Sequence, residues 1–278
     1  MNEQVIPQES KNKEDNYEYR PMNEANKAFM EYAIDMYKGQ ENDPRFEATG
    51  QITIDLPNGL NNFIIKKYVY SPEHVQVAMA WPEFIAGRSE GKSFLEIGTG
   101  TGVAAIYIAM NGKPSRVVAT DISPIAVENC RENAKQYNLK EPFFSIGEGS
   151  VYEALPNKDE KFDIMFWNFP WNAPDTTIEE ILEERGEKTT PEKINQLQAG
   201  LDPLYQGLRY FIRDGQKYLN SGGEILLGAS EMVRDDIIQG EVEKYGYNIE
   251  IASEKEMVVD KIGNKTLKVI LYRLTKKI

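Results

Sequence analysis

Apolar residues along this 278-residue chain recur with two spacings, one typical of helices and one typical of strands. In residues 21–38 they recur every three or four positions and Gly39 follows, which predicts one amphipathic helix. Residues 51–70, QITIDLPNGLNNFIIKKYVY, hold two β-type runs around the turn sequence Pro-Asn-Gly, which predicts a hairpin. Helical spacing returns in residues 71–86.

After Gly91, short apolar strands alternate with helical patterns. We expect strands at 93–97, 116–120, 142–146, 162–167 and 224–227, helices at 102–110, 124–137 and 204–219, and a closing hairpin from the β-like runs 246–253 and 266–274. Ser123 is placed to cap the helix that begins at Pro124. This alternation predicts an α/β fold, doubly wound, with a mostly parallel sheet covered by helices on both faces.

The chain divides into three predicted parts. Residues 1–20 are polar and are expected to form a mobile tail, and residues 21–90 form a small helix-and-hairpin region on the substrate side or acting as a lid. Residues 91–278 form the main domain. They include an acidic, weakly patterned insertion at 172–200, for which a lid, a partner contact and a simple surface helix are all compatible with the sequence.

Composition narrows the possible functions. The formal charge of -12 argues against affinity for nucleic acid that rests on phosphate neutralisation. No apolar run approaches the roughly 20 residues that span a bilayer, and the first residues lack signal-peptide character, so we expect a cytoplasmic protein without a membrane partner. With Cys130 and His74 as the single cysteine and histidine, an internal disulfide, a cysteine-based zinc cluster and a histidine-rich metal site are excluded, and we expect no metal.

The stretch FLEIGTGTG, residues 94–102, places three glycines at the junction between a predicted strand and the predicted helix that follows it. Glycine suits a tight turn whose backbone comes close to a ligand. Gly100, Gly102 and Ala105 satisfy a loose dinucleotide pattern, which keeps a nicotinamide-dependent oxidoreductase open as an alternative. Glu96 favours S-adenosylmethionine instead, because a carboxylate suits a ligand with a cationic amino acid portion and would repel a pyrophosphate.

Longer motifs give this pattern a family resemblance. They are ATGQITIDLPNGLNNFIIKKYVYSPEH, FLEIGTGTGVAAIYIA, ATDISPIAVENCRENAKQYNL, GSVYEALP, FDIMFWNFPW and DPLYQGLRYFIRDGQKYLNSGGEILL. Over about residues 48–275 the chain resembles class I S-adenosylmethionine-dependent methyltransferases. Within them it is most similar to the release-factor glutamine methyltransferases and their relatives that act on exocyclic amines. The resemblance implies a seven-stranded Rossmann-like sheet and S-adenosyl-L-methionine as the cofactor.

Matching motifs imply the cofactor residues. They are Glu96, Gly98, Thr99, Gly100 and Gly102 in the loop, Asp121 at the ribose, Ile122 beside the adenine, and Ser150, Val151 and Asn168. Ser150 stands where the family usually has an aspartate that contacts the adenine amine. The hydroxyl of Ser150 can accept one hydrogen bond, and the backbone N–H of Val151 can donate to the ring.

The fourth strand of this branch ends in Asn-Pro-Pro-Tyr or a close variant, and the matching residues here are Asn168, Phe169, Pro170 and Trp171. An amide or aromatic amine is a poor nucleophile until its NH₂ group is held. The side-chain oxygen of Asn168 and the main-chain carbonyl of Phe169 can accept its two N–H bonds. Pro170 stiffens the turn, and Trp171 offers a flat face to a planar or cationic acceptor. Asn168, Pro170 and Trp171 are therefore the predicted catalytic residues.

The acceptor is less defined. Phe169 replaces the usual proline and adds bulk, so Tyr70, His74, Phe169 and Trp171 are the substrate-binding candidates. The favoured function is methylation of an amide or amine nitrogen, on a protein side chain or a small molecule. The alternatives are a small-molecule N- or O-methyltransferase with an enclosed pocket and a non-catalytic S-adenosylmethionine-binding protein.

Overall fold

The computed structural model describes residues 22–72, 79–259 and 265–277. The expected tail at 1–20 and the substrate candidate His74 lie outside these residues. Within them, every helix is too short or too polar to cross a membrane.

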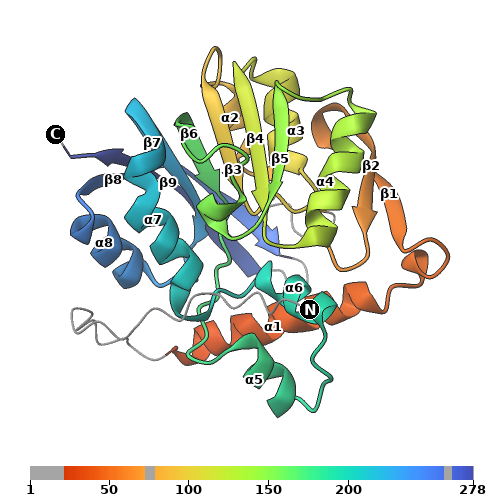
Figure 1. Ribbon diagram of the computed structural model, residues 1–278. Coiled ribbons are helices and arrows are strands. Elements are labelled where there is room, and N and C mark those ends of the chain that lie inside the picture. Colours follow the sequence, from red (N-terminus) through yellow and green to blue (C-terminus); the bar gives the residue numbers. More distant parts are fainter. Residues whose placement is uncertain (1–21, 73–78, 260–264, 278) are drawn as a thin grey trace.

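A seven-stranded sheet forms the centre of the molecule, with strand order β5-β4-β3-β6-β7-β9-β8 (Figure 1). Its strands are β3 (Ser93–Ile97), β4 (Arg116–Asp121), β5 (Phe144–Glu148), β6 (Phe162–Trp167), β7 (Leu219–Ser230), β8 (Tyr247–Val259) and β9 (Lys265–Lys276). The first five of these are parallel to one another, and β9 runs antiparallel to both β7 and β8. The predicted mostly parallel, seven-stranded sheet is confirmed.

Helices cover both faces of this sheet. They are α2 (Pro82–Ala86), α3 (Val103–Asn111) and α4 (Pro124–Gln136) on one side, and α7 (Gln206–Tyr218) and α8 (Asp235–Lys244) on the other (Figure 1). Neighbouring residues of a strand point to opposite faces. Accordingly, Phe94 packs in the cluster beneath α2 and α3, whereas Leu95 packs in the cluster beneath α7 and α8. The central strands are therefore buried on both faces, as the apolar runs predicted.

A separate two-stranded hairpin, β1 (Gln51–Leu56) and β2 (Leu60–Lys66), packs against α4. The side chain of Asn133 accepts a hydrogen bond from the backbone N–H of Ile64 and donates to the carbonyl of the same residue, both at 2.8 Å. Asn129 accepts from the backbone N–H of Lys66 at 2.8 Å and also donates to Ile64. Asn133 further donates to the carbonyl of Thr101 at 2.9 Å, so one amide joins the hairpin to the glycine loop.

Helix α1 (Glu24–Glu41) and the insertion form one layer, which we call the cap and define as residues 24–41 together with 172–200. The insertion contains α5 (Ile178–Glu184) and α6 (Pro191–Gln198). Apolar side chains from both segments share a cluster: Ala33, Ile34, Tyr37, Ile178, Ile181, Leu182 and Leu197. In Figure 1 the cap lies below the sheet, on the side of the loop that follows β6.

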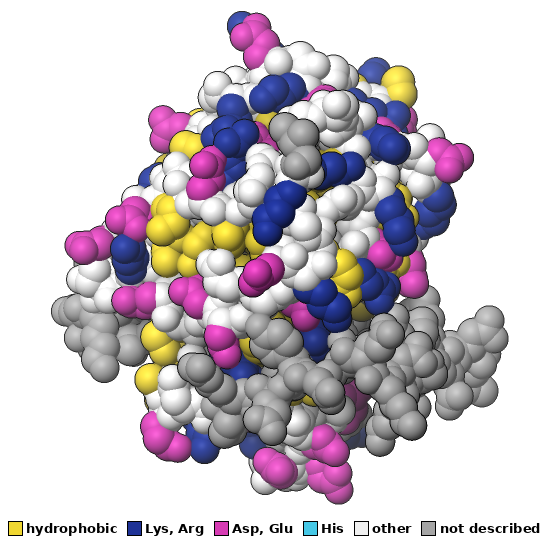
Figure 2. All heavy atoms as spheres, turned by 90° about the vertical axis from the view of Figure 1, so that its left-hand side faces the viewer, with side chains coloured by type: hydrophobic (Ala, Val, Ile, Leu, Met, Phe, Trp, Pro, Cys, Tyr) yellow, Lys and Arg dark blue, Asp and Glu magenta, His cyan; other side chains and the backbone are white. Residues whose placement is uncertain are grey.

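Acidic and basic side chains are interspersed on the face shown in Figure 2. The acidic side chains, whose excess gives the net charge of -12, therefore do not form one continuous acidic patch on this face.

Candidate active site

The glycine loop joins the end of β3 to the start of α3. Gly98, Gly100 and Gly102 have φ angles of +63°, +56° and +87°, in the left-handed region that favours glycine. A Cβ at Gly98 would lie 2.8 Å from Nε1 of Trp167, whereas a Cβ at Gly100 would meet nothing within 4 Å. The loop is thus packed against β6 at Gly98 and leaves open space at Gly100, where a ligand can approach the backbone.

Glu96 lies just before this loop and is 4% exposed. Its Oε2 accepts hydrogen bonds from the hydroxyl of Thr99 at 2.7 Å and from the backbone N–H of Ala105 at 3.0 Å. Burial raises the pKa of this carboxyl to about 8, against the lowering effect of the two hydrogen bonds. A cation placed beside Glu96 would lower this pKa again, which suits the predicted contact with a cationic amino group.

Asp121 ends the neighbouring strand β4 and reaches the same loop. Its Oδ2 accepts from the backbone N–H of Gly100 at 2.8 Å, and its Oδ1 accepts from the backbone N–H of Ser123 at 2.9 Å. Burial raises the pKa of Asp121. Each carboxylate oxygen has a further lone pair, so the predicted ribose contact is compatible with these bonds. Ile122 beside it is 39% exposed, an unusual position for a large apolar side chain and one that a planar ring could cover.

The segment after β5 comes to the same edge of the sheet. The backbone N–H of Gly149 donates to the carbonyl of Asp121 at 3.0 Å, which places Ser150 and Val151 next to that strand end. Val151 has a φ of +43° and is buried, and Ser150 is half-buried. The predicted cofactor residues from β3, β4 and β5 are therefore brought together at the carboxyl ends of adjacent parallel strands.

Asn168 directly follows β6 and carries the most unusual polar group of the site. Its Oδ1 is buried and has no hydrogen-bond partner among the described residues, and the same holds for Nε1 of Trp81. Both atoms face Gly228 of β7, where a Cβ would lie 2.6 Å from Oδ1 of Asn168 and 3.1 Å from Nε1 of Trp81. A buried amide oxygen without a partner is costly, so a ligand that donates to it would recover that free energy.

Phe169 and Pro170 are both buried. The ring of Phe169 is 1% exposed and makes edge contacts with Trp167 and Tyr205, at centroid distances of 6.4 Å and 5.7 Å. This ring belongs to the core cluster beneath α7 and α8. Only the main chain of Phe169 is therefore left for the predicted acceptor contact.

Trp171 is half-buried and fixed at three points. Its Nε1 donates to the carbonyl of Gly228 at 3.1 Å, and its own carbonyl accepts from the hydroxyl of Tyr205 at 2.7 Å. Its ring stacks on Phe29 of α1, with centroids 6.3 Å apart and an angle of 19° between the planes. Trp171 thus connects the sheet to the cap.

Tyr70, the other described substrate candidate, lies against the cap. Its ring is 6.0 Å from that of Tyr37 and packs at the edge of the cap cluster. Burial raises the pKa of the Tyr70 hydroxyl well above its usual value.

Sequence reasoning missed three residues of this region: Phe29, Trp81 and Gly228. Gly228 directly follows the predicted strand 224–227, and a glycine at a strand often marks a close approach of another group, so a signal was present there. Phe29 lies within a predicted amphipathic helix and Trp81 within a helical pattern, so their neighbours could not be inferred from spacing alone.

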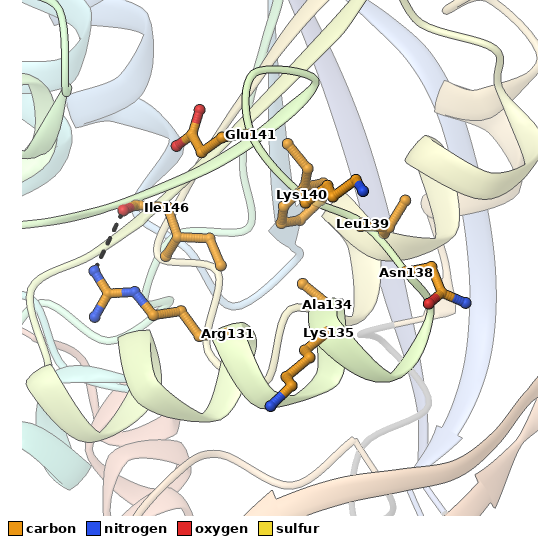
Figure 3. A pocket seen from close by; sticks show the side chains of 9 residues that line it. Arg131, Ala134, Lys135, Asn138, Leu139, Lys140, Glu141 and Ile146 are labelled. Atoms are coloured by element: carbon orange, nitrogen blue, oxygen red, sulfur yellow. Dashed lines mark hydrogen bonds between the residues drawn. The ribbon is translucent and has the colours of Figure 1, made fainter.

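A hollow lies elsewhere, on the outer flank of α4 and β5 (Figure 3). It measures about 480 Å³ and is lined by Arg131, Ala134, Lys135, Asn138, Leu139, Lys140, Glu141, Phe144 and Ile146. Arg131 donates to the carbonyl of Ile146 at 3.5 Å across it. None of the predicted site residues lines this hollow.

Comparison with known proteins identifies the fold and the family. Residues 88–244, more than half of the chain, match the family described as "Methyltransferase domain". The chain belongs to this methyltransferase-domain family. The enzyme class and cofactor expected from the sequence, a methyltransferase that uses S-adenosylmethionine, agree with this membership.

Several curated relatives of this methyltransferase match part of the chain. It is 31% identical to the bifunctional methyltransferase of Rickettsia felis over 63% of this chain and 32% of that protein. It is 27% identical to the release factor glutamine methyltransferase of Geobacter sulfurreducens over 62% of this chain and 58% of that protein. The match to the Coxiella burnetii protein of that name is 30% identical and covers 50% and 46%. The chain thus spans less than two thirds of each of these relatives.

Solved structures share the fold of this methyltransferase. TYW2 of Pyrococcus horikoshii in complex with MeSAdo has a TM-score of 0.53 at 14% identity, covering 82% of this chain and 73% of that chain. Trm5b of Pyrococcus abyssi has a TM-score of 0.50 at 17% identity, covering 82% and 57%. At such identities the likeness concerns the fold alone.

Proposed function

We propose that this methyltransferase transfers the methyl group of S-adenosylmethionine to an amide or amine nitrogen. One observation carries the choice of acceptor: the buried Oδ1 of Asn168, unpartnered among the described residues, just after the end of β6. An oxygen in that position can accept a hydrogen bond but cannot donate one. It therefore suits an acceptor that donates hydrogen bonds, such as a planar NH₂ group.

The residues around the loop fit the cofactor. Gly100 leaves space for a ligand against the backbone, and Glu96 lies where it can receive a cationic amino group. Asp121 retains lone pairs for ribose hydroxyls, while the exposed Ile122 suits the adenine ring. Gly98, Thr99 and Gly102 shape this loop, and Ser150 and Val151 border it from β5.

The bound sulfonium supplies an electrophilic methyl group. Asn168 holds one N–H of the acceptor through Oδ1, and the main-chain carbonyl of Phe169 holds the second. With both N–H bonds held, the nitrogen lone pair points toward the methyl group, and both oxygens stabilise the positive charge that develops on nitrogen. Transfer of the methyl group would form the N–C bond as the S–C bond breaks, and the nitrogen would then release its proton to water. No strong base is needed before transfer.

The curated relatives support nitrogen as the acceptor atom. Those from Geobacter sulfurreducens and Coxiella burnetii are named for glutamine, whose side chain ends in a planar NH₂ group. A nicotinamide-dependent oxidoreductase is the alternative suggested by Gly100, Gly102 and Ala105. It would not explain the buried, unpartnered Oδ1 of Asn168.

The test combines binding and turnover. Calorimetry with S-adenosylhomocysteine should show binding, and labelled S-adenosylmethionine should label a component of an extract from the source cells. Asn168→Ala should lower the turnover about 100-fold, because one charge-stabilising contact in the transition state is lost. Its affinity for S-adenosylhomocysteine should change little.

Asn111→Ala is the matched control, since this exposed amide on α3 bonds only the carbonyl of Tyr107 among the described residues. Unchanged turnover in Asn168→Ala would refute the role of this amide. Binding of S-adenosylhomocysteine without any methyl transfer would show a cofactor-binding protein instead of an enzyme.

A further inference from the structure

Helix α1 crosses the acceptor end of the site from one side of the sheet to the other. Near its N-terminus, the side chain of Asn26 donates to the carbonyl of Met232, just after β7, at 2.7 Å. At its other end, the side chain of Gln40 donates to the carbonyl of Val69, just after the hairpin, at 2.5 Å. With 18 residues the helix is about 27 Å long. It therefore spans the region in front of β6.

The insertion holds α1 in this position. Arg185 pairs with Glu31 and with Asp35 of α1, the latter at 3.1 Å. Lys38 pairs with Glu187 at 2.5 Å. These contacts follow one side of the helix over two turns. Together with the apolar cluster of the cap, they make α1 part of the folded structure and not an appended arm.

The inner side of α1 meets the predicted acceptor residues. Phe29 stacks on Trp171 and on Tyr32, with ring centroids 6.3 Å apart in both pairs. Phe29 is half-buried, and Oδ1 of Asn168, three residues before Trp171, is buried. Aromatic side chains of the cap therefore lie beside the segment that we propose holds the acceptor nitrogen.

From this geometry, and resting on the proposed function, we infer that the acceptor is a compact small molecule with a planar NH₂ group, and that Phe29 determines this specificity. A residue within a polypeptide brings backbone on both sides of its side chain and needs a trough open at two ends. Here α1 lies across that region, with Phe29 stacked on Trp171. The half-buried ring of Phe29, stacked beside Trp171, offers an apolar surface that suits a planar group.

This inference separates the chain from the relatives named for release factors, whose acceptor is a protein. The cap segment 24–41 lies outside the residues that match the methyltransferase-domain family. A difference in acceptor class can thus come from the cap while the cofactor loop stays the same.

The first experiment divides an extract of the source cells by dialysis into metabolites and proteins. Each pool receives the full chain and labelled S-adenosylmethionine, and a purified release factor serves as a defined protein probe. Label in the metabolite pool alone is the expected result. Label in the protein pool or on the release factor overturns this inference and leaves the proposed function standing. Label in neither pool, with S-adenosylhomocysteine bound in calorimetry, overturns the proposed function itself.

The second experiment tests Phe29 with the labelled metabolite fraction as the substrate. Phe29→Ala should lower kcat/KM about threefold to tenfold, as expected for the loss of one aromatic pair, mainly through KM. Affinity for S-adenosylhomocysteine should stay the same. Phe84→Ala is the matched control, because Phe84 is also half-buried and stacks under Arg88, away from the cap. Equal kinetics in both variants would overturn the assignment of Phe29.

Discussion

The glycine loop and the cap meet at one site but are built in opposite ways. In the loop, one important contact joins Thr99 to Glu96, three positions apart, and another joins Gly100 to Asp121, 21 positions apart. In the cap, Arg185 bonds Glu31 across 154 positions. The loop depends on single atoms and backbone angles, whereas the cap depends on the shared burial of many side chains. Individual hydrogen bonds and backbone angles therefore shape the cofactor end, and the packing of many side chains shapes the acceptor end.

A pair of glycine substitutions should show the largest difference between the loop and the cap. Gly100 in the loop and Gly186 in the cap have φ angles of +56° and +67°, and a Cβ at either would meet nothing within 4 Å. Gly100→Ala and Gly186→Ala should therefore cost similar backbone strain, about 1 kcal/mol of unfolding free energy. Only Gly100→Ala should weaken S-adenosylhomocysteine binding, by about tenfold or more, because its methyl group enters the ligand space.

Urea unfolding gives the first quantity and calorimetry gives the second. If both variants lost affinity equally, the effect would come from backbone strain and the open space at Gly100 would not be the ligand site.

A smaller effect, the release of protons on ligand binding, should distinguish the glycine loop from the cap. The pKa of Glu96 is raised to about 8, so at pH 7 its carboxyl is mostly protonated in the free protein. A cationic amino group would ionise it. Binding of S-adenosylhomocysteine at pH 7 should therefore release up to about one proton per site, and this release should vanish in Glu96→Gln. Calorimetry in buffers of different ionisation enthalpy measures it.

The same carboxyl sets a stability trend in the free protein. Between its usual pKa of 4.5 and the raised value of about 8, the folded chain holds a proton that the unfolded chain has released. This contribution is complete below pH 4.5 and is lost as the pH rises through 8. Glu96→Gln should have a flatter dependence in this window, and an unchanged slope would contradict the protonated state.

The smallest effect is expected at the surface of the cap. Arg185 is 21% exposed and its partners Glu31 and Asp35 are 53% and 69% exposed, so solvent screens these pairs. Arg185→Gln should lower the unfolding free energy by less than about 1 kcal/mol. Ile181→Ala, at a side chain only 4% exposed, should cost more. Thermal unfolding of both variants compares them. The reverse order would mean that charge pairs hold the cap together.

Much of the fold could be predicted because its signals are local. The strands 93–97 and 162–167 lie where the apolar runs placed them, and Ser123 caps α4 by accepting from the backbone of Ala126. Other boundaries moved. Helix α1 begins at Glu24 instead of residue 21, β5 begins two residues later than predicted, and β7 extends well beyond 224–227. Strand ends are set by pairing with neighbours, which periodicity does not report.

Some site residues were predicted correctly and others were not, again because local signals are visible in the sequence and long-range packing is not. The glycines and Asp121 meet at one edge, as parallel strands require. The predicted role of Phe169 as a substrate wall rested on its size. Its ring instead fills the core against Tyr205, a residue 36 positions away in sequence. Likewise, the packing of the insertion against α1 could not be predicted, since the sequence of neither segment indicates which other segment it contacts.

The amides of Asn129 and Asn133 have an effect that reaches beyond a single molecule. Strand β2 pairs with β1 along one side, and these two side chains occupy backbone groups of Ile64 and Lys66 that β1 leaves free. Unpaired groups on a strand edge recruit strands from other molecules and start aggregation. By imitating a neighbouring strand, the two asparagines keep this hairpin from joining a second copy of the chain.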